Sequence, residues 1–476
     1  MFQRTSHLFY GSSLFTLPWI GLGLIKWSTG VDVGAGLQIS WLLMFLAMIL
    51  LVMDKTKQQG IIPSLSEFWA GIPSPWRIGA GLTILAVLVS GCGLLVARVQ
   101  ESSWIVWSRY IRQIIQLSIM GFFVLWPALW TRGSIRWRWT VQILVISALV
   151  QAAYGLVQGI SFYQPNGLFF QLESVFTSNP AILSGSEQLH LGNLFRDVPR
   201  LRGTACEPLY LGSYILMVMP WALLGGLGSR IRWTAGVILG MLILATWSRG
   251  AWLGLLIQIV GWLILVFLAR NHRSPARPSI SLPGLTRIGW IVASILLLLL
   301  ALDMLLGREA LFMPLERVIQ SFSRQDWSNL TRLYSMQAAW RAFNLSPLVG
   351  VGWGQFAWHF PVLADPVGLQ SQFEWPMVNN FPLKVLCETG IIGFMVFIGS
   401  ALGLGRAVLH RLRDRDRENG MVIPASLAVI GIWTQLLTFS QYNLPHIWIA
   451  LGLLLAALRD ESLPQQGSSP GQGGAG

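Results

Sequence analysis

The feature that most constrains this chain is its succession of long apolar runs, separated by short segments that carry much of its charge. A membrane-spanning helix needs about 17 to 25 predominantly apolar residues, and twelve runs qualify as candidates on this pattern. We therefore predict an all-α integral membrane protein with about twelve transmembrane helices. The predicted spans are 8–28, 36–53, 78–97, 111–130, 139–160, 209–228, 233–247, 250–269, 286–306, 382–405, 421–439 and 446–458.

Composition excludes the soluble alternatives. The 476 residues are 54% hydrophobic and only 11% charged, which indicates one polytopic membrane domain over residues 1–460 in place of several soluble domains. The net charge of +13 would suit nucleic acid, but the basic residues gather in short loops between apolar runs, where membrane orientation explains them. The Gly/Ser/Gln-rich segment 461–476 is predicted to be a disordered cytoplasmic tail.

The basic loops also predict the orientation of the chain. In a twelve-span arrangement they all fall on one side, which the positive-inside rule assigns to the cytoplasm. Both termini are then cytoplasmic, and two long loops, about 161–208 and 307–381, lie outside the membrane. We expect these external loops to contain short helices and the chemistry-bearing side chains.

Motifs for cofactors are missing from the sequence. It has no Walker A loop, no dinucleotide-binding glycine fingerprint and no HExxH, and its three cysteines lack metal-ligand spacing. We therefore expect no cofactor and no bound metal. Any reaction would draw its driving force from an activated substrate that arrives at the membrane.

Three arginines at the external side are candidates for holding an anion. Arg249 lies in TWSRGAW, a very short outer connection between two spans. Arg332 and Arg341 lie in NLTRLYSMQAAWRAF, where apolar residues at helical spacing predict an amphipathic helix. Arginine near the apolar layer either snorkels to lipid headgroups or holds an anionic ligand. Arg341 has a third interpretation, because it can simply face solvent on the same helix.

A second external segment, RLRGTACEP, ends where a span begins. Arg202 is a further candidate ligand, and Glu207 is either an ion-pair partner or an acid/base group, since Glu207-Pro208 is also a favourable helix start. Among the external histidines, His359 is the favoured candidate base because it lies between the arginine helix and the segment that re-enters the membrane.

From Arg332 onward the chain resembles the O-antigen ligase and Wzy-type polymerase superfamily. The runs RLYSMQAAWRAFNLSPLVGVGWGQF and NNFPLKVLCETGIIGFMVF are similar to its signature of an Arg, a Trp/Ala helix, P-x-x-G-x-G-x-x-F, H-N-x-x-L and E-x-G-x-x-G. Upstream, the SRG at 248–250 is similar as well, and the resemblance extends over about 195–440.

The resemblance implies a GT-C-like membrane glycosyltransferase of the inverting type. Such an enzyme takes a glycan from a polyprenyl (undecaprenyl) diphosphate and joins it to a saccharide, a lipid-saccharide or, less in keeping with this chain, a protein acceptor. The reaction would occur on the outer face of the bacterial inner (plasma) membrane. Arg249 and Arg332 match the family arginines that would hold the diphosphate, because a guanidinium can stabilise the charge of the leaving group in place of a metal ion.

One departure from the signature bears on the mechanism. The family's histidine before the L…G run is replaced by Asn379, which can orient a hydroxyl but has no useful basicity, and Asn380 beside it is a candidate substrate ligand. Three explanations stay open. Another group serves as the base, with His359, Glu207 and Glu374 as candidates. Otherwise the reaction needs little base catalysis, or the protein has lost activity.

Two other classes of protein share the general pattern. A polysaccharide flippase or other transporter would also be a basic, many-span protein, but transporters place ionisable or helix-breaking residues at mid-membrane in related halves. Here the polar groups concentrate in the external loops, which favours an enzyme. A non-catalytic assembly protein of a cell-surface polysaccharide pathway stays open because of Asn379.

Overall fold

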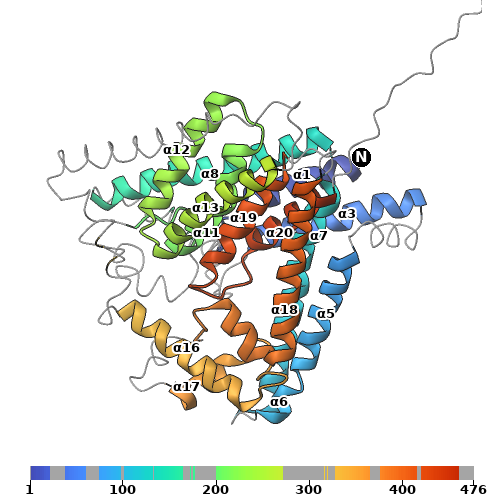
Figure 1. Ribbon diagram of the computed structural model, residues 1–476, viewed down its shortest axis with the longest axis vertical. Coiled ribbons are helices and arrows are strands. Elements are labelled where there is room, and N and C mark those ends of the chain that lie inside the picture. The colour runs from blue at the N-terminus through green and yellow to red at the C-terminus, as the bar shows by residue number, and fades with distance from the viewer. Residues whose placement is uncertain are drawn as a thin grey trace, which may run out of the picture.

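A computed structural model of the chain describes residues 2–21, 38–59, 74–97, 101–131, 133–163, 200–271, 327–364, 376–414 and 420–459, with a few isolated positions between 172 and 319. Within these ranges the secondary structure is helical and contains no strand (Figure 1). The fold class predicted from the apolar runs is confirmed in this respect.

The helices of the described ranges vary widely in length, from one turn to more than eight. They are α1 (Phe2–Phe15), α3 (Ile39–Gln59), α5 (Ser74–Ser90), α6 (Gly93–Val96), α7 (Ser103–Trp130), α8 (Gly133–Tyr163), α11 (Pro208–Leu224), α12 (Ser229–Ala245), α13 (Arg249–Asn271), α16 (Trp327–Leu345), α17 (Phe356–Ala364), α18 (Phe381–Arg413), α19 (Val422–Gln435) and α20 (Pro445–Arg459).

Five helical segments in the described ranges are long and apolar enough to cross a membrane: Trp76–Val96, Ser103–Trp130, Gly133–Ser161, Arg249–Leu268 and Phe381–Arg413. Large apolar side chains on them are exposed, for example Ile84, Leu256 and Ile264. Water would penalise such exposed faces, whereas lipid tails accommodate them, so the molecule is an integral membrane protein.

Eleven of the twelve predicted spans overlap helices in the described ranges, and the twelfth, 286–306, lies outside them. The number of membrane crossings stays a prediction, because several of these helices are short. The first predicted span, 8–28, is partly wrong: α1 ends at Phe15 and the chain turns at Thr16, two residues before Pro18, where a helix would lose a backbone donor.

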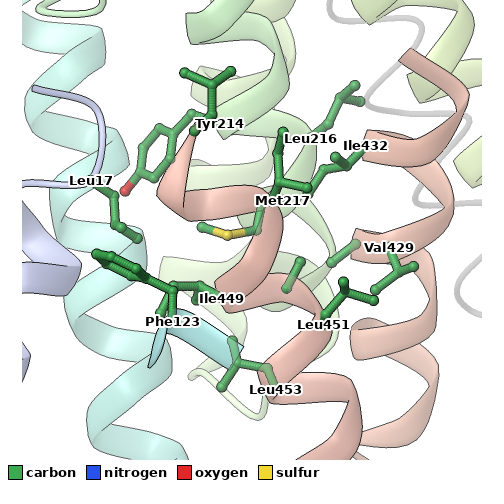
Figure 2. Packing of buried hydrophobic residues seen from close by; sticks show 14 of the residues in the cluster. Leu17, Phe123, Tyr214, Leu216, Met217, Val429, Ile432, Ile449, Leu451 and Leu453 are labelled. Carbon is green, nitrogen blue, oxygen red and sulfur yellow. The ribbon is translucent and has the colours of Figure 1, made fainter. Parts of the chain in front are cut away.

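The core is built around α11, in which nearly every residue is buried. It packs mainly against α19 and α12, and also against α8, α13 and α20. Figure 2 shows Tyr214 and Met217 of α11 in one cluster with Phe123 of α7, Ile432 of α19 and Ile449 of α20. Deep burial of an apolar helix on all sides is typical of the centre of a helical membrane bundle.

A glutamine joins α11, α13 and α19. The Gln258 side-chain amide donates to the carbonyls of Leu216, at 2.7 Å, and Leu427, at 2.9 Å. The helices approach closely because Gly254 and Gly431 face this junction, where an added Cβ would collide with Leu216 and with Gln258. Small residues and interhelical hydrogen bonds are the usual means of helix association in lipid, and here they fix the relative positions of the three helices.

The helix α18 is broken at Gly390, whose φ of 65° and ψ of −170° interrupt the helical backbone. The 347–354 turn (PLVGVGWG) is inserted at the break. Val351 and Gly352 donate to the carbonyls of Cys387, at 2.9 Å, and Glu388, at 3.0 Å. On the other side, the amides of Ile391 and Ile392 donate to carbonyls of the same turn. The backbone groups freed by the break are thus satisfied, as burial requires.

This junction explains why the 347–354 turn and the broken part of α18 contain glycines. A Cβ at Gly350 would collide with the backbone of Glu388 and Thr389, and one at Gly390 would collide with the backbone of Leu348 and Val349. Gly350, Gly352 and Gly354 also have positive φ, which glycine adopts without steric cost. The predicted turn and the helix predicted in NLTRLYSMQAAWRAF, which is α16, are therefore confirmed, and both pack against α18.

Candidate active site

Arg249 is the first residue of α13, directly after a tight turn at the end of α12. Trp247 in this turn has a φ of 50°, and the Ser248 amide donates to Thr246 Oγ1 at 3.2 Å. The residue after the arginine, Gly250, touches Thr438, and a Cβ there would lie 2.5 Å from Thr438 Oγ1. The SRG sequence therefore forms the start of α13, and its glycine allows this helix start to pack closely against the turn at the end of α19.

Glu207 is the residue at which α11 begins, and Pro208 follows it as the first helical residue. Its carbonyl accepts from the amides of Tyr210 and Leu211, but its carboxylate makes no capping hydrogen bond to the helix. Burial raises the pKa of this carboxyl, and nearby Arg200 partly offsets the rise. The carboxylate is therefore more basic than an ordinary glutamate.

The start of α18 meets the same turn. The Asn380 side chain caps α18 by accepting from the Leu383 amide at 2.9 Å, and its amide group donates to the Leu437 carbonyl at 3.1 Å. The amide of Phe381 donates to the Leu436 carbonyl at 2.9 Å. The side chain of Asn380 therefore has two roles. Its oxygen caps α18, and its NH2 group binds the turn at the end of α19.

We call residues 435–438, at the end of α19, the 435–438 turn. Gln435 donates to the carbonyl of Leu209, in the first turn of α11, at 2.9 Å. Thr438 touches Gly250 at the start of α13. The carbonyls of Leu436 and Leu437 accept from the start of α18. The starts of α11, α13 and α18 therefore converge on it. Helix starts carry partial positive charge and unpaired amides, so this convergence favours an anion.

Arg332 lies on α16, which contacts the segment before α18. The Ser335 hydroxyl donates to the Arg332 carbonyl at 2.8 Å, and it accepts from the backbone amide of Asn379 at 3.2 Å and from the side-chain amide at 3.3 Å. Arg332 and Ser335 are three positions apart and share a helix face. The structure therefore brings Asn379 beside the arginine-bearing face of α16 and fixes its orientation.

Arg341 and His359 lie apart from this contact network. Arg341 is nine positions beyond Arg332, on the opposite face of α16, and donates to the carbonyl of Leu363 near the end of α17. His359 is buried in α17 beside Phe356 and Phe360, which pack on α16. Burial lowers the pKa of His359 to about 4, so the imidazole is neutral and a weaker base than usual.

Arg202 faces another neighbour, the helix α8. Its backbone amide and that of Gly203 donate to Gln158 of α8 at 3.2 and 3.1 Å, and its guanidinium is buried close to Tyr154 of α8. Burial lowers the pKa of Arg202 to about 10, which leaves it charged at neutral pH. The segment that carries Arg202 is thus fastened to α8, while Glu207 at its end reaches the helix starts. Glu374 lies outside the described residues.

Sequence reasoning missed a buried polar cluster next to this site. Glu388 and Lys384 of α18 form an ion pair, with Nζ 2.7 Å from Oε2, and Tyr442 and Arg109 lie alongside. Two signals in the sequence pointed to it: the i, i+4 spacing of Lys384 and Glu388, and the polar residues of α7 at helical spacing near the outer end of an apolar run.

Together these features define, in the described ranges, a helical integral membrane protein in which the starts of three helices converge on one turn. Within this class, residues 234–398 match the family described as O-Antigen ligase (Wzy_C). The match covers about a third of the chain, and it confirms the resemblance read from the motifs. The matched residues include Arg249, Arg332 and Asn379. No curated protein sequence matches the chain.

Proposed function

We propose that this protein is a membrane glycosyltransferase that transfers a glycan from a polyprenyl diphosphate to a saccharide or lipid-saccharide acceptor. The observation that carries the proposal is the convergence of three helix starts on the 435–438 turn, within and beside an O-antigen ligase domain. Helix starts and arginines together suit a diphosphate, whose charge must be neutralised without a metal ion.

In the proposed reaction, a hydroxyl oxygen of the acceptor forms a bond to the anomeric carbon of the donor glycan. The bond from that carbon to the diphosphate oxygen breaks, and its electron pair stays on the diphosphate. Arg249 and Arg332 stabilise the negative charge that develops there, which is the largest single contribution that a protein usually makes to such a step. Attack from the face opposite the leaving group inverts the anomeric configuration.

The proton of the acceptor hydroxyl goes to Glu207 in this proposal. Its carboxylate makes no capping bond to its own helix, lies at the converging helix starts and has a raised pKa. Asn379 orients the hydroxyl through its amide, as its hydrogen bonds to Ser335 keep it in place beside Arg332. His359 is less suited because burial makes it a weak base. Arg202 and Asn380 support the site through α8 and through the α18 cap, whereas Arg341 binds α17 away from it.

For the setting, we propose the bacterial inner membrane, with twelve spans, cytoplasmic termini and the site on the outer face. The distribution of basic loops supports this orientation. The two external loops then hold most of the site, in keeping with α16, which is polar enough to lie outside the bilayer.

The test is reconstitution of the purified protein in lipid vesicles with a polyprenyl diphosphate oligosaccharide and a saccharide acceptor, following release of the lipid diphosphate. We expect Arg249→Ala and Arg332→Ala each to lower kcat by about 10²- to 10³-fold, the usual cost of removing one group that stabilises a transition-state charge. Arg341→Ala is the matched control, because this arginine is on the opposite face of α16 and should leave kcat near the wild-type value.

Three results would contradict the proposal. Unimpaired turnover by Arg249→Ala and Arg332→Ala would exclude the arginine clamp. Wild-type protein that binds the lipid diphosphate, yet never releases it in the presence of any acceptor tested, would favour the non-catalytic assembly protein. Movement of the intact lipid-linked glycan across the vesicle membrane would instead indicate a flippase.

A further inference from the structure

The Glu388 carboxylate joins three parts of the external structure. Oε2 accepts from the Gly354 amide at 2.9 Å, Oε1 accepts from the Phe356 amide at 3.3 Å, and Lys384 Nζ lies 2.7 Å from Oε2. Gly354 ends the inserted turn and Phe356 begins α17. One buried side chain therefore caps the start of α17, holds the end of the 347–354 turn and pairs with a cation one helical turn earlier on α18.

The partners of this carboxylate are themselves held by α7 and by the chain after α19. Lys384 Nζ lies 5.4 Å from the centre of the Trp353 ring and 6.0 Å from that of Tyr442. The Tyr442 hydroxyl donates to Gln113 of α7 at 2.7 Å, and Arg109 of α7 donates to the Gly354 carbonyl at 2.9 Å. The ammonium is thus surrounded by aromatic faces and a carboxylate, which fixes its position.

This cluster supports the segment of α18 that reaches the proposed site. The Lys384 amide donates to the Asn380 carbonyl at 2.9 Å, so Lys384 lies one turn below the cap. Asn379 and Asn380 in turn contact α16 and the 435–438 turn. A shift of Glu388 relative to α17 would therefore move Asn379 relative to Arg332.

We propose that Glu388 and Lys384 are positioning residues for the glycosyl transfer: they hold the first two turns of α18 at the distance from α16 and α17 that the reaction requires. The proposal rests on the proposed function for its kinetic consequence only. The ion pair alone does not explain the arrangement, because a buried pair costs desolvation energy and apolar side chains can often replace it without loss of stability. Its carboxylate is needed to cap the two amides of the turn and of α17.

The first experiment needs no substrate. Hydrogen exchange is measured on the detergent-purified protein for wild type, Glu388→Gln and Glu101→Gln, in which an exposed carboxylate is lost instead. We expect faster exchange of residues 350–356 in Glu388→Gln, because a neutral amide cannot accept from Gly354 and Phe356 as a carboxylate does, and unchanged exchange in Glu101→Gln. Unchanged exchange in both variants would overturn the positioning role, whatever the protein's activity.

The second experiment measures kinetics in the vesicle assay. We expect Glu388→Gln to lower kcat by about 10- to 100-fold with little change in lipid diphosphate binding, since misplacement by about 1 Å costs rate more than affinity. Glu388→Asp, which keeps the charge, should recover part of kcat. The exchanged pair Lys384→Glu/Glu388→Lys should not recover, because a lysine at 388 cannot accept from the two amides.

The outcomes separate the two proposals. Altered exchange together with a wild-type protein that never releases the diphosphate would reject the proposed function and keep the structural role of Glu388. Full recovery of kcat by the exchanged pair would overturn the positioning proposal, because it would show that the ion pair alone matters. Equal loss of binding and kcat in Glu388→Gln, with lowered thermal stability, would overturn it too, in favour of general destabilisation.

Discussion

At the scale of single residues, burial separates side chains that the sequence presents as equivalent. Glu207 and His359 are both external candidates for a base, yet burial raises the pKa of Glu207 and lowers that of His359 to about 4. A sequence shows which groups titrate but not how deeply each is buried. The arginines differ in the same way, since Arg332 shares a face with Ser335 and Arg341 lies on the opposite face.

The pH dependence of kcat distinguishes the two bases. Glu207 acts only when ionised, so activity should be lost as the pH falls through its raised pKa, at a midpoint above the usual glutamate value of about 4.3. Glu207→Gln should lower kcat and abolish this acidic limb, while His359→Asn should leave it. A limb with a midpoint near 4 that disappears only in His359→Asn would assign the base to His359.

At the scale of elements, the predicted helices and turn were largely found, but their connections were not foreseeable. The apolar periodicity gives helices at most predicted spans, and the glycines of 347–354 give a turn. The break of α18 at Gly390 could not be predicted, because the pattern of VNNFPLKVLCETGIIG is that of one uninterrupted helix entering the membrane. Its cause is long-range: hydrogen bonds from a turn some forty residues earlier replace those that the helix loses.

The broken helix makes Gly390 a sensitive position. Gly390→Ala should lower the free energy of unfolding by at least about 1–3 kcal/mol, the usual cost of a strained backbone, with a further loss from collision with the backbone of Leu348. The measurement is thermal unfolding in detergent. Gly399→Ala is the control on the same helix, where the added methyl meets open space and should be neutral or slightly stabilising. Equal stability of both variants would argue against the break.

At the scale of the whole molecule, a buried bundle adjoins the assembly that α16, α17 and the 347–354 turn form with α18. The helices α11, α19 and α20 form the centre, and α16 and α17 lie at the opposite end of the molecule from α12 and α8 (Figure 1). Composition and apolar runs were sufficient to predict this class of fold. They could not predict which helix starts meet, because that depends on packing at positions such as Gly212, Gly250 and Gln258.

The orientation of the molecule is open to a direct measurement. Single cysteines placed at exposed positions in a background without the three native cysteines, all of which are free thiols, can be labelled with a membrane-impermeant maleimide in intact cells. We expect labelling at Asn344, in α16, and none at Arg406, near the basic end of α18. The reverse pattern would invert the predicted topology and move the proposed site to the cytoplasmic side.

The 435–438 turn has a consequence for protein engineering. It lies outside residues 234–398, as does Glu207, although both meet helix starts inside or beside that segment. The matched segment is therefore not a transplantable module. A chimera that receives this segment would also need α19, α20 and the start of α11 from the same parent. The end of α19 contacts the helix starts that carry Arg249 and Asn380, and it also binds the start of α11.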